Sequence, residues 1–235
     1  MTPAEQEALR HKVQVVSRLL EEAYGRPEPG PRLDPISELV NTFLSQNTTD
    51  VNRDRAFARL RERFPDWEAV MSAPEDEVEA TIRPAGLAGQ KAPRIQAALR
   101  HIYAQEGRLS LDFLADVPLE EAKRWLTELR GVGPKTAAIV LLFALGRPAF
   151  PVDTHVHRVS RRLGLIGPNV MADKAHDMLE NLVEPDLYYP FHINLIRHGR
   201  RVCIARNPKC GICVLSRHCD YYQSLQSSDG SQSGG

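Results

Sequence analysis

The stretch WLTELRGVGPKTAAIVLLFALG, residues 125–146, decides the fold of this 235-residue chain. A helical pattern ends just before a tight turn made of Gly131, Val132 and Gly133. Proline at the first position of a helix is a start signal, so a second helix begins at Pro134. The pattern predicts a helix–hairpin–helix, although a plain αα-turn, which often contains glycine, is the alternative.

The predicted turn has the features of an anion site. Gly131 and Gly133 lack the Cβ atoms that would block close approach of a partner to the backbone, and the N–H groups at the start of the next helix point at a phosphate. Lys135 stands in the first turn of that helix, where the helix dipole disfavours a cation. Since a deprotonated lysine is a nucleophile able to form a Schiff base, Lys135 is a candidate catalytic amine. The alternative is a phosphate-binding or merely exposed lysine.

Helical periodicity also runs through the rest of the chain. Prolines and glycines separate the periodic segments, and no alternating run longer than a few residues appears, so the sequence predicts an all-α fold with short loops. The final stretch SLQSSDGSQSGG, 224–235, is small and polar and predicts a disordered tail. The periodic segments before the hairpin are 5–25, 35–48, 52–64, 66–73, 75–86 and 91–107.

Composition excludes several classes of protein. Apolar residues make up 42% of the chain and charged residues 26%, as in an ordinary globular protein. No apolar run approaches the roughly 20 residues of a membrane span, and the charged N-terminus lacks the apolar core of a signal peptide. We therefore expect a cytoplasmic protein without a membrane partner.

The charge is balanced overall but uneven along the chain. The net charge is zero, yet the segment 192–219 contains six Lys or Arg residues and no Asp or Glu. A basic face on a neutral molecule can still bind phosphates. The alternative is an ordinary solvated surface of mixed charge.

The chain has four cysteines, Cys203, Cys210, Cys213 and Cys219, spaced C-x6-C-x2-C-x5-C. Sulfur ligation of this kind suits zinc or an iron–sulfur cluster. A pair of disulfides would need an oxidising compartment, and nothing in the sequence indicates export. Zinc sites commonly show two C-x2-C pairs and this chain has one, while the spacing also differs from the ferredoxin runs. The cysteines alone leave cluster and zinc open.

A second candidate for chemistry lies in FPVDTHVHRVSRRLGL, residues 150–165. Asp153 precedes a helical run and is therefore an expected N-cap. A carboxylate at that place can also stabilise a developing cation or assist proton transfer. We interpret His155 and His157 as packing or capping residues rather than ligands or bases.

Three motifs in this order, LRGVGPKTA, VDTHVHRVSRRLGL and HGRRVCIARNPKCGICVLSRHC, resemble the endonuclease III family of DNA base-excision glycosylases. The resemblance extends from about Pro35 to Tyr222. It implies a helix–hairpin–helix DNA glycosylase fold, with a six-helix barrel domain over 36–147 and a helical [4Fe-4S] cluster domain formed by 1–35 and 148–223. It also implies that the four cysteines hold a [4Fe-4S] cluster, because their spacing is the family's cluster pattern.

The resemblance further implies the catalytic roles. Lys135 would attack C1′ of a damaged nucleotide flipped out of the duplex and displace its base. The resulting Schiff base would permit β-elimination of the 3′ phosphate, with Asp153 assisting departure of the base and later proton transfers. Gly131, Val132 and Gly133 would hold a backbone phosphate.

Two loops resemble those with which the family fills the gap left by the flipped nucleotide. They are FLSQNTTD, 43–50, and GLAGQKA, 86–92, and their candidate gap-filling residues are Asn47, its neighbour Gln46, and Leu87. The first loop departs from the pattern, because many members read S-A-Q-A-T where this chain reads S-Q-N-T-T.

The implied function is that of a monomeric bifunctional DNA glycosylase/AP lyase associated with the nucleoid. It would remove oxidised pyrimidines from double-stranded DNA and cleave abasic sites. One alternative is a monofunctional adenine or thymine mismatch glycosylase of the same superfamily, although those enzymes lack lysine at position 135. The other alternative is a non-catalytic DNA-binding protein.

Overall fold

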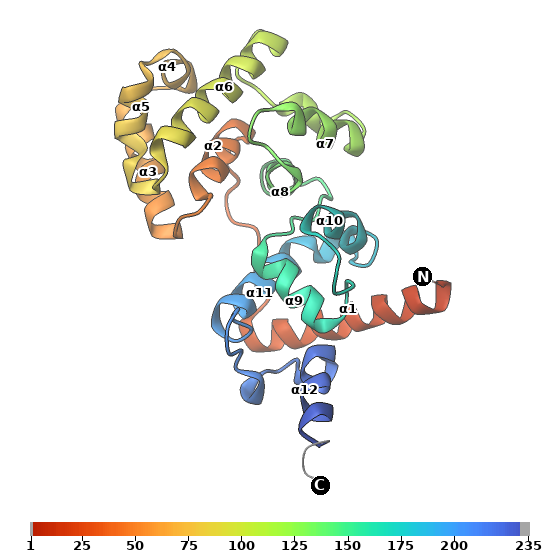
Figure 1. Cartoon of the computed structure of the whole chain (residues 1–235). Coiled ribbons are helices and arrows are strands. Elements are labelled where there is room, and N and C mark those ends of the chain that lie inside the picture. The colour runs from red at the N-terminus through yellow and green to blue at the C-terminus, as the bar shows by residue number, and fades with distance from the viewer. Residues whose placement is uncertain (1, 231–235) are drawn as a thin grey trace. The chain divides into compact units, whose positions relative to one another are not determined.

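The computed structural model describes residues 2–230, with side chains described through residue 227, and the chain divides into two compact units. The hairpin unit is Pro31–Ala149, and the cysteine unit combines Met1–Gly30 with Phe150–Gly235. The described residues form helices and loops without a strand, which confirms the all-α prediction (Figure 1).

The helices of the hairpin unit are α2 (Pro35–Ser45), α3 (Asp50–Arg63), α4 (Trp67–Ser72), α5 (Glu75–Ile82), η1 (Arg83–Ala85), α6 (Ala88–Glu106), η2 (Asp112–Ala115), α7 (Leu119–Glu128), α8 (Pro134–Ile139) and the π-helical turn η3 (Val140–Ala144). Those of the cysteine unit are α1 (Pro3–Tyr24), α9 (Thr154–Leu163), α10 (Ala172–Glu180), η4 (Pro185–Leu187), α11 (Tyr188–Arg201), η5 (Cys210–Ile212), η6 (Ser216–His218) and α12 (Asp220–Gly230).

Helix α2 forms the centre of the hairpin unit. Asp34 caps it by accepting a hydrogen bond from the backbone N–H of Ser37 at 2.9 Å, and proline occupies its first position. Its side chains Leu39, Phe43 and Leu44 are fully buried, and the helix packs against α3, α6 and α8. This burial places the C-terminal end of α2 next to both the hairpin and the start of α6.

The hairpin turn joins α7 to α8, as the sequence predicts, but its two glycines have different reasons to be there. Gly131 has a φ of +89°, and a Cβ built on it would lie 3.2 Å from atoms of Phe43 and Arg94. Gly133 has extended backbone, and a Cβ there would meet nothing within 4 Å. The fold therefore requires glycine at 131, whereas position 133 faces open space.

The cysteine unit is organised around the pairing of α9 with α11, which also packs on α1. The Oδ1 atom of Asp153 accepts the backbone N–H of Val156 at 2.7 Å, which confirms this residue as the N-cap of α9. His157 bonds the carbonyl of Val170 at 2.7 Å, in keeping with a packing role.

Helix α6 begins at Ala88, three residues before the expected segment at 91–107. Leu87 adopts the left-handed conformation, and its carbonyl accepts the backbone N–H groups of Gln90 and Lys91. A bulky residue in this conformation has no local sequence signal, so the sequence pattern predicts the start of α6 three residues too late.

The tail expected to be disordered from 224 onwards instead continues as helix α12 as far as Gly230. The hydroxyls of Ser224 and Ser227 donate to the carbonyls of Tyr221 and Gln223, so these polar residues bond back to their own helix. Residues 231–235 of the expected tail lie outside the described residues.

The unit boundaries differ from the expected domain boundaries at two places. Residues 31–35 and 148–149 belong to the hairpin unit rather than to the cysteine unit. Asp34 caps α2, and the backbone N–H of Ala149 donates to the carbonyl of Arg147. The guanidinium of Arg147 in turn donates to the carbonyls of Leu114 and Val117, so hydrogen bonds tie both segments to the hairpin unit. Within the described part of the chain, no helix combines the length and apolarity needed to cross a membrane.

Because Gly131 has a positive φ and Gly133 does not, we expect Gly131→Ala to destabilise the protein by at least about 1–2 kcal/mol. Gly133→Ala should change the free energy of unfolding by less than about 0.5 kcal/mol, since its backbone suits any residue. Chemical denaturation of the two variants and the wild type measures the difference. Equal destabilisation by both substitutions would contradict this account of the turn.

Candidate functional site

The two loops expected to fill the DNA gap both contain a strained residue. Asn47 has φ +52° and Leu87 has φ +50°, and only Asn207 shares this conformation among the other non-glycine residues that the structure describes. The side chain of Leu87 is also 49% exposed. A bulky residue such as leucine rarely adopts left-handed backbone, and nothing in the local sequence favours it here. Such strain persists only where the surrounding structure holds it, and it concentrates at functional sites.

The structure brings these two loops together in space. An open hollow in the hairpin unit is lined by Asn47, Thr48 and Thr49 of the first loop and by Gly86, which begins the second. Asn52 of α3 and Pro84 of η1 complete the lining. Gln46 ends helix α2 immediately before this hollow, in extended conformation. Segments almost 40 residues apart in the sequence therefore share one surface.

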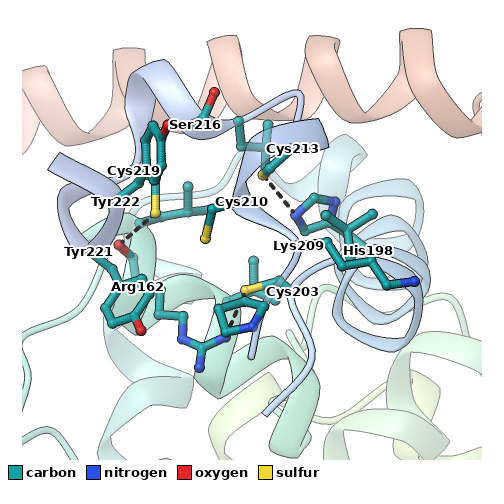
Figure 2. Close-up of a pocket in the computed structure, with 15 residues that line it drawn as sticks. Arg162, His198, Cys203, Lys209, Cys210, Cys213, Ser216, Cys219, Tyr221 and Tyr222 are labelled. Carbon is teal, nitrogen blue, oxygen red and sulfur yellow. Dashed lines mark hydrogen bonds between the residues drawn. The ribbon is translucent and has the colours of Figure 1, made fainter. Parts of the chain in front are cut away.

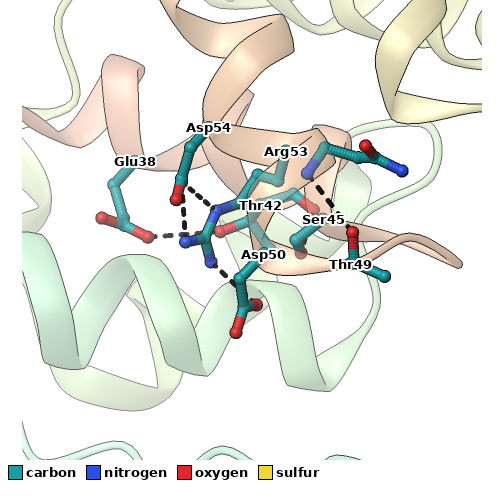
Figure 3. A network of polar contacts seen from close by, with 8 residues as sticks. Glu38, Thr42, Ser45, Thr49, Asp50, Arg53 and Asp54 are labelled. Atoms are coloured by element: carbon teal, nitrogen blue, oxygen red, sulfur yellow. Dashed lines mark hydrogen bonds and ion pairs between the residues drawn. The ribbon is translucent and has the colours of Figure 1, made fainter.

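A polar network fixes the corner between α2 and α3, beside the first loop (Figure 3). Arg53 pairs with Asp54 at 2.8 Å and with Asp50 at 3.4 Å, while the hydroxyl of Ser45 donates to the carbonyl of Thr42 at 2.7 Å. Burial raises the pKa of Glu38, although its hydrogen bond to Thr42 and the charge of Arg53 act against this. The network limits how far the Gln46–Thr49 loop can move relative to the helices on either side.

Lys135 belongs to the same unit as the two loops, in helix α8. It is half-buried at the second position of α8, two residues after Gly133. The turn that precedes it packs through Gly131 against Phe43 of α2 and Arg94 of α6. The same two helices therefore carry the hairpin and the two strained loops.

The four cysteines line a single pocket in the cysteine unit (Figure 2). A nitrogen of Arg162 lies 3.3 Å from the sulfur of Cys203, and Nε2 of His198 lies 3.5 Å from that of Cys213. Nitrogen donors facing the sulfurs are the usual partners of cluster thiolates. This donor set fits an iron–sulfur cluster.

The cysteine thiols of this pocket are partly or fully buried, which affects their ionisation. Burial raises the pKa of the Cys213 thiol to about 11 and also raises that of Cys219. Thiolates are required for ligation, so bound iron would have to displace the thiol protons. Among the described residues, no group of three or more His, Cys, Asp or Glu side chains is arranged to hold one ion. A four-iron cluster takes one thiolate on each iron, so its ligands need not meet at a point.

His198 connects this pocket to helix α1. Burial lowers its pKa to about 4, so its ring is neutral at physiological pH. Its Nδ1 lies 3.0 Å from the hydroxyl of Tyr24, and when that hydroxyl donates, the ring proton is on Nε2 and faces Cys213. Sequence reasoning missed this residue, because only the fold brings Tyr24 to it.

Two arginines of α9 tie the cysteine loop to the helix that Asp153 caps. Arg158 donates to the carbonyl of Cys203 at 2.9 Å and to that of Gly199 at 2.8 Å. Arg162 donates to the carbonyls of Ile204 and Ala205. Their i, i+4 spacing in the run HRVSRR indicates a shared helix face, but not what that face contacts.

The candidate site residues are divided between the two units. The hairpin unit contains Gly131, Val132, Gly133, Lys135, Gln46, Asn47 and Leu87, whereas the cysteine unit contains Asp153, Cys203, Cys210, Cys213 and Cys219. Sequence reasoning also missed Lys91, a buried lysine that lies behind the two loops.

Comparison with known proteins identifies the family. Residues 40–185 match the HhH-GPD superfamily of base excision DNA repair proteins, and residues 203–219 match the iron–sulfur binding domain of endonuclease III. The chain is 34% identical to endonuclease III of Thermotoga maritima, over 84% of this chain and 88% of the relative. It is 39% identical to the Arabidopsis thaliana protein named "Putative DNA glycosylase", over 70% of this chain but only 56% of that protein.

The fold agrees with this assignment. A solved non-covalent endonuclease III–DNA complex has a TM-score of 0.77 to the chain, with 27% identity over 93% of this chain and 98% of the other. The matched iron–sulfur domain begins at Cys203 and ends at Cys219, so the cofactor is the [4Fe-4S] cluster of that family. The chain belongs to the endonuclease III family of DNA glycosylase/AP lyases, within the HhH-GPD superfamily of base excision repair proteins.

Proposed function

We propose that this protein is a bifunctional DNA glycosylase and AP lyase that removes oxidised pyrimidines from double-stranded DNA. The observation that carries the proposal is the position of Lys135 in the first turn of α8, two residues beyond Gly133. The hairpin turn at Gly133 has an open outer face. A phosphate bound at the turn would bring a nucleotide of the same strand near the lysine amine.

The chemistry then follows from the amine. Nζ of Lys135 forms a bond to C1′ of the flipped nucleotide while the bond from C1′ to the base breaks, and the base leaves with that electron pair. Ring opening gives a Schiff base between C1′ and Nζ. Loss of a proton from C2′ then allows the C3′–O bond to break, which cuts the strand.

Asp153 has two compatible tasks in this scheme. As N-cap of α9 it has one carboxylate oxygen engaged by Val156. The other oxygen is available to stabilise positive charge at C1′ as the base departs and to take part in proton transfer.

The two strained loops would occupy the gap in the duplex. Asn47 and Leu87 are exposed and lie on loops that share one hollow, and Leu87 holds a left-handed conformation that its own side chain does not favour. Filling the gap offsets part of the unstacking free energy of the flipped nucleotide. Gln46, immediately before Asn47, would contact the duplex at the same place.

Cys203, Cys210, Cys213 and Cys219 would be the cluster ligands. The cluster would be structural, because all four positions are taken by protein. It would hold the loop that Arg158 and Arg162 bind, and thereby the helix that Asp153 caps. We further propose that the protein acts as a monomer in the cytoplasm, on the DNA of the nucleoid.

If the turn binds backbone phosphate, Gly133→Ala should weaken binding to damaged and undamaged duplexes by the same factor, because phosphate contacts carry no base information. Fluorescence anisotropy with a series of duplexes measures this. The stability of the variant, predicted above to be unchanged, is the control. Loss of affinity for only one lesion would contradict a phosphate role.

The purified protein should be brown and contain about four iron atoms per chain. Cys213→Ala should remove most of the iron and the visible absorption and lower the melting temperature, because the cluster binds only the folded loop. Metal analysis and visible spectroscopy test both statements. Stoichiometric zinc without iron in the wild type would reject the cluster assignment.

Lys135→Gln should abolish base release and strand cleavage on a duplex with an oxidised pyrimidine, while DNA affinity changes little, because one amine performs both steps. Borohydride trapping of the wild type should give a covalent protein–DNA adduct that this variant lacks. Asp153→Asn, as a comparison, should slow base release more than cleavage of a preformed abasic site, where the aldehyde is already exposed.

Two outcomes would count against the scheme. An adduct formed by Lys135→Gln at the wild-type rate would show that another amine is the nucleophile. Base release by the wild type without strand cleavage would instead favour the monofunctional mismatch glycosylase, and DNA binding without either activity would favour the non-catalytic alternative.

A further inference from the structure

Lys91 is a lysine with an unusual position. Its side chain is only 2% exposed, and its Nζ donates hydrogen bonds of 2.8 Å to the carbonyls of Leu44 and of Ala85. Burial also lowers its pKa. A lysine in the interior needs a specific compensating role, because desolvation of an ammonium group is unfavourable unless its donors are satisfied.

The two carbonyls belong to the ends of the segments that lead into the strained loops. Leu44 is in the last turn of α2, two residues before Gln46, and Ala85 is the last residue of η1, two residues before Leu87. An ammonium group at the carbonyl end of a helix is also favoured by the helix dipole. The backbone N–H of Lys91 donates to the carbonyl of Leu87 at 3.0 Å. Through its side chain, Lys91 thus bonds to the helix end that leads into each loop, and through its backbone it bonds to Leu87 itself.

We propose that Lys91 is a positioning residue that clamps the Gln46–Thr49 loop to the Gly86–Leu87 loop, so that Asn47 and Leu87 are already placed to enter the gap left by a flipped nucleotide. The inference rests on the proposed function for the identity of the ligand, but the clamp is a property of the free protein. Each loop contains a residue with positive φ. The hydrogen bonds from Lys91 to the chain just before each loop resist relaxation of that residue toward an ordinary backbone conformation.

The role follows from the chemistry of the lysine side chain. An apolar residue of the same size would leave the two buried carbonyls without this donor, which is unfavourable for each. Lys91 would act through the loops, since its amine is buried and directed at two main-chain oxygens of the protein. Pre-ordered loops avoid the loss of conformational entropy on binding. The clamp would therefore strengthen binding to a duplex with a flipped-out or abasic nucleotide relative to an undamaged duplex.

Helix α6 offers a matched control in Gln96. This side chain is also fully buried, and its Nε2 donates to two main-chain carbonyls, those of Val70 at 2.9 Å and Ala73 at 2.8 Å. Those carbonyls belong to α4 and its C-cap rather than to either loop. Gln96→Met and Lys91→Met each remove two side-chain hydrogen bonds to main-chain carbonyls from the same helix, the donor being a neutral amide in one case and an ammonium group in the other. Only Lys91→Met is expected to affect the loops.

The first measurement is hydrogen–deuterium exchange of the free protein. In Lys91→Met we expect the amides of residues 46–49 and 86–90 to exchange about tenfold faster than in the wild type, as loss of bonds from a charged donor would produce. In Gln96→Met these segments should exchange at the wild-type rate, while residues near 70–73 exchange faster. Unchanged loop exchange in a folded Lys91→Met would overturn the clamp.

The second measurement is the ratio of affinities for a duplex with a tetrahydrofuran abasic-site analogue and for the same duplex undamaged. In Lys91→Met we expect this ratio to fall about tenfold, with affinity for the undamaged duplex retained, because phosphate contacts do not involve the clamp. Gln96→Met should keep the wild-type ratio. An equal fall in both variants would show a general stability effect and overturn a positioning role.

If Lys91→Met does not fold, Lys91→Gln keeps N–H donors on a shorter side chain and should show smaller changes in the same direction. No change in either measurement for that variant would again overturn the proposal. A wild type that does not prefer the abasic duplex would refute the proposed function, whereas loop exchange in the free variants would still support or reject the clamp.

Discussion

The contact between the hairpin turn and the end of helix α2 organises the hairpin unit. Gly131 lies against the buried ring of Phe43, where an added Cβ would make a tight contact of 3.2 Å in addition to the strain of its positive φ. The next residue of α2, Leu44, offers its carbonyl to Lys91, and the chain then enters the loop with Asn47. The C-terminal end of α2 therefore contacts the hairpin turn through Phe43, binds Lys91 through the carbonyl of Leu44, and leads directly into the loop with Asn47.

The strain in these loops is balanced by polar contacts placed behind them. Leu87 starts α6 in a left-handed conformation, and main-chain and side-chain bonds of Lys91 hold the residues around it. On the other side, Arg53 and its acidic partners secure the first turn of α3 (Figure 3). Rigid loops of this kind present side chains at a constant position, as the gap-filling role proposed for Asn47 and Leu87 would require.

In the cysteine unit, too, side chains from neighbouring helices hold an exposed segment in place, in this case the segment with the four cysteines. Its pocket brings together four thiols from a segment whose only helices are the short turns η5 and η6 (Figure 2). Arg158 and Arg162 reach this loop from α9, and His198 links it to Tyr24 of α1. On the proposed ligation, a bound cluster would stabilise a loop that Arg158 and Arg162 connect to the helix capped by Asp153.

The sequence by itself determined the features that depend on neighbours within a turn or two of helix. Proline after a glycine turn marked the start of α8, Asp153 before a periodic run was recognisable as an N-cap, and the cysteine spacing indicated a metal pocket. Tertiary structure alone decided that Leu87 is left-handed and begins α6, and that Lys91 reaches Leu44, 47 residues away. The reason is physical: periodicity and capping record local backbone energies, whereas a buried lysine and a strained leucine are stabilised by partners from distant segments, which no local pattern contains.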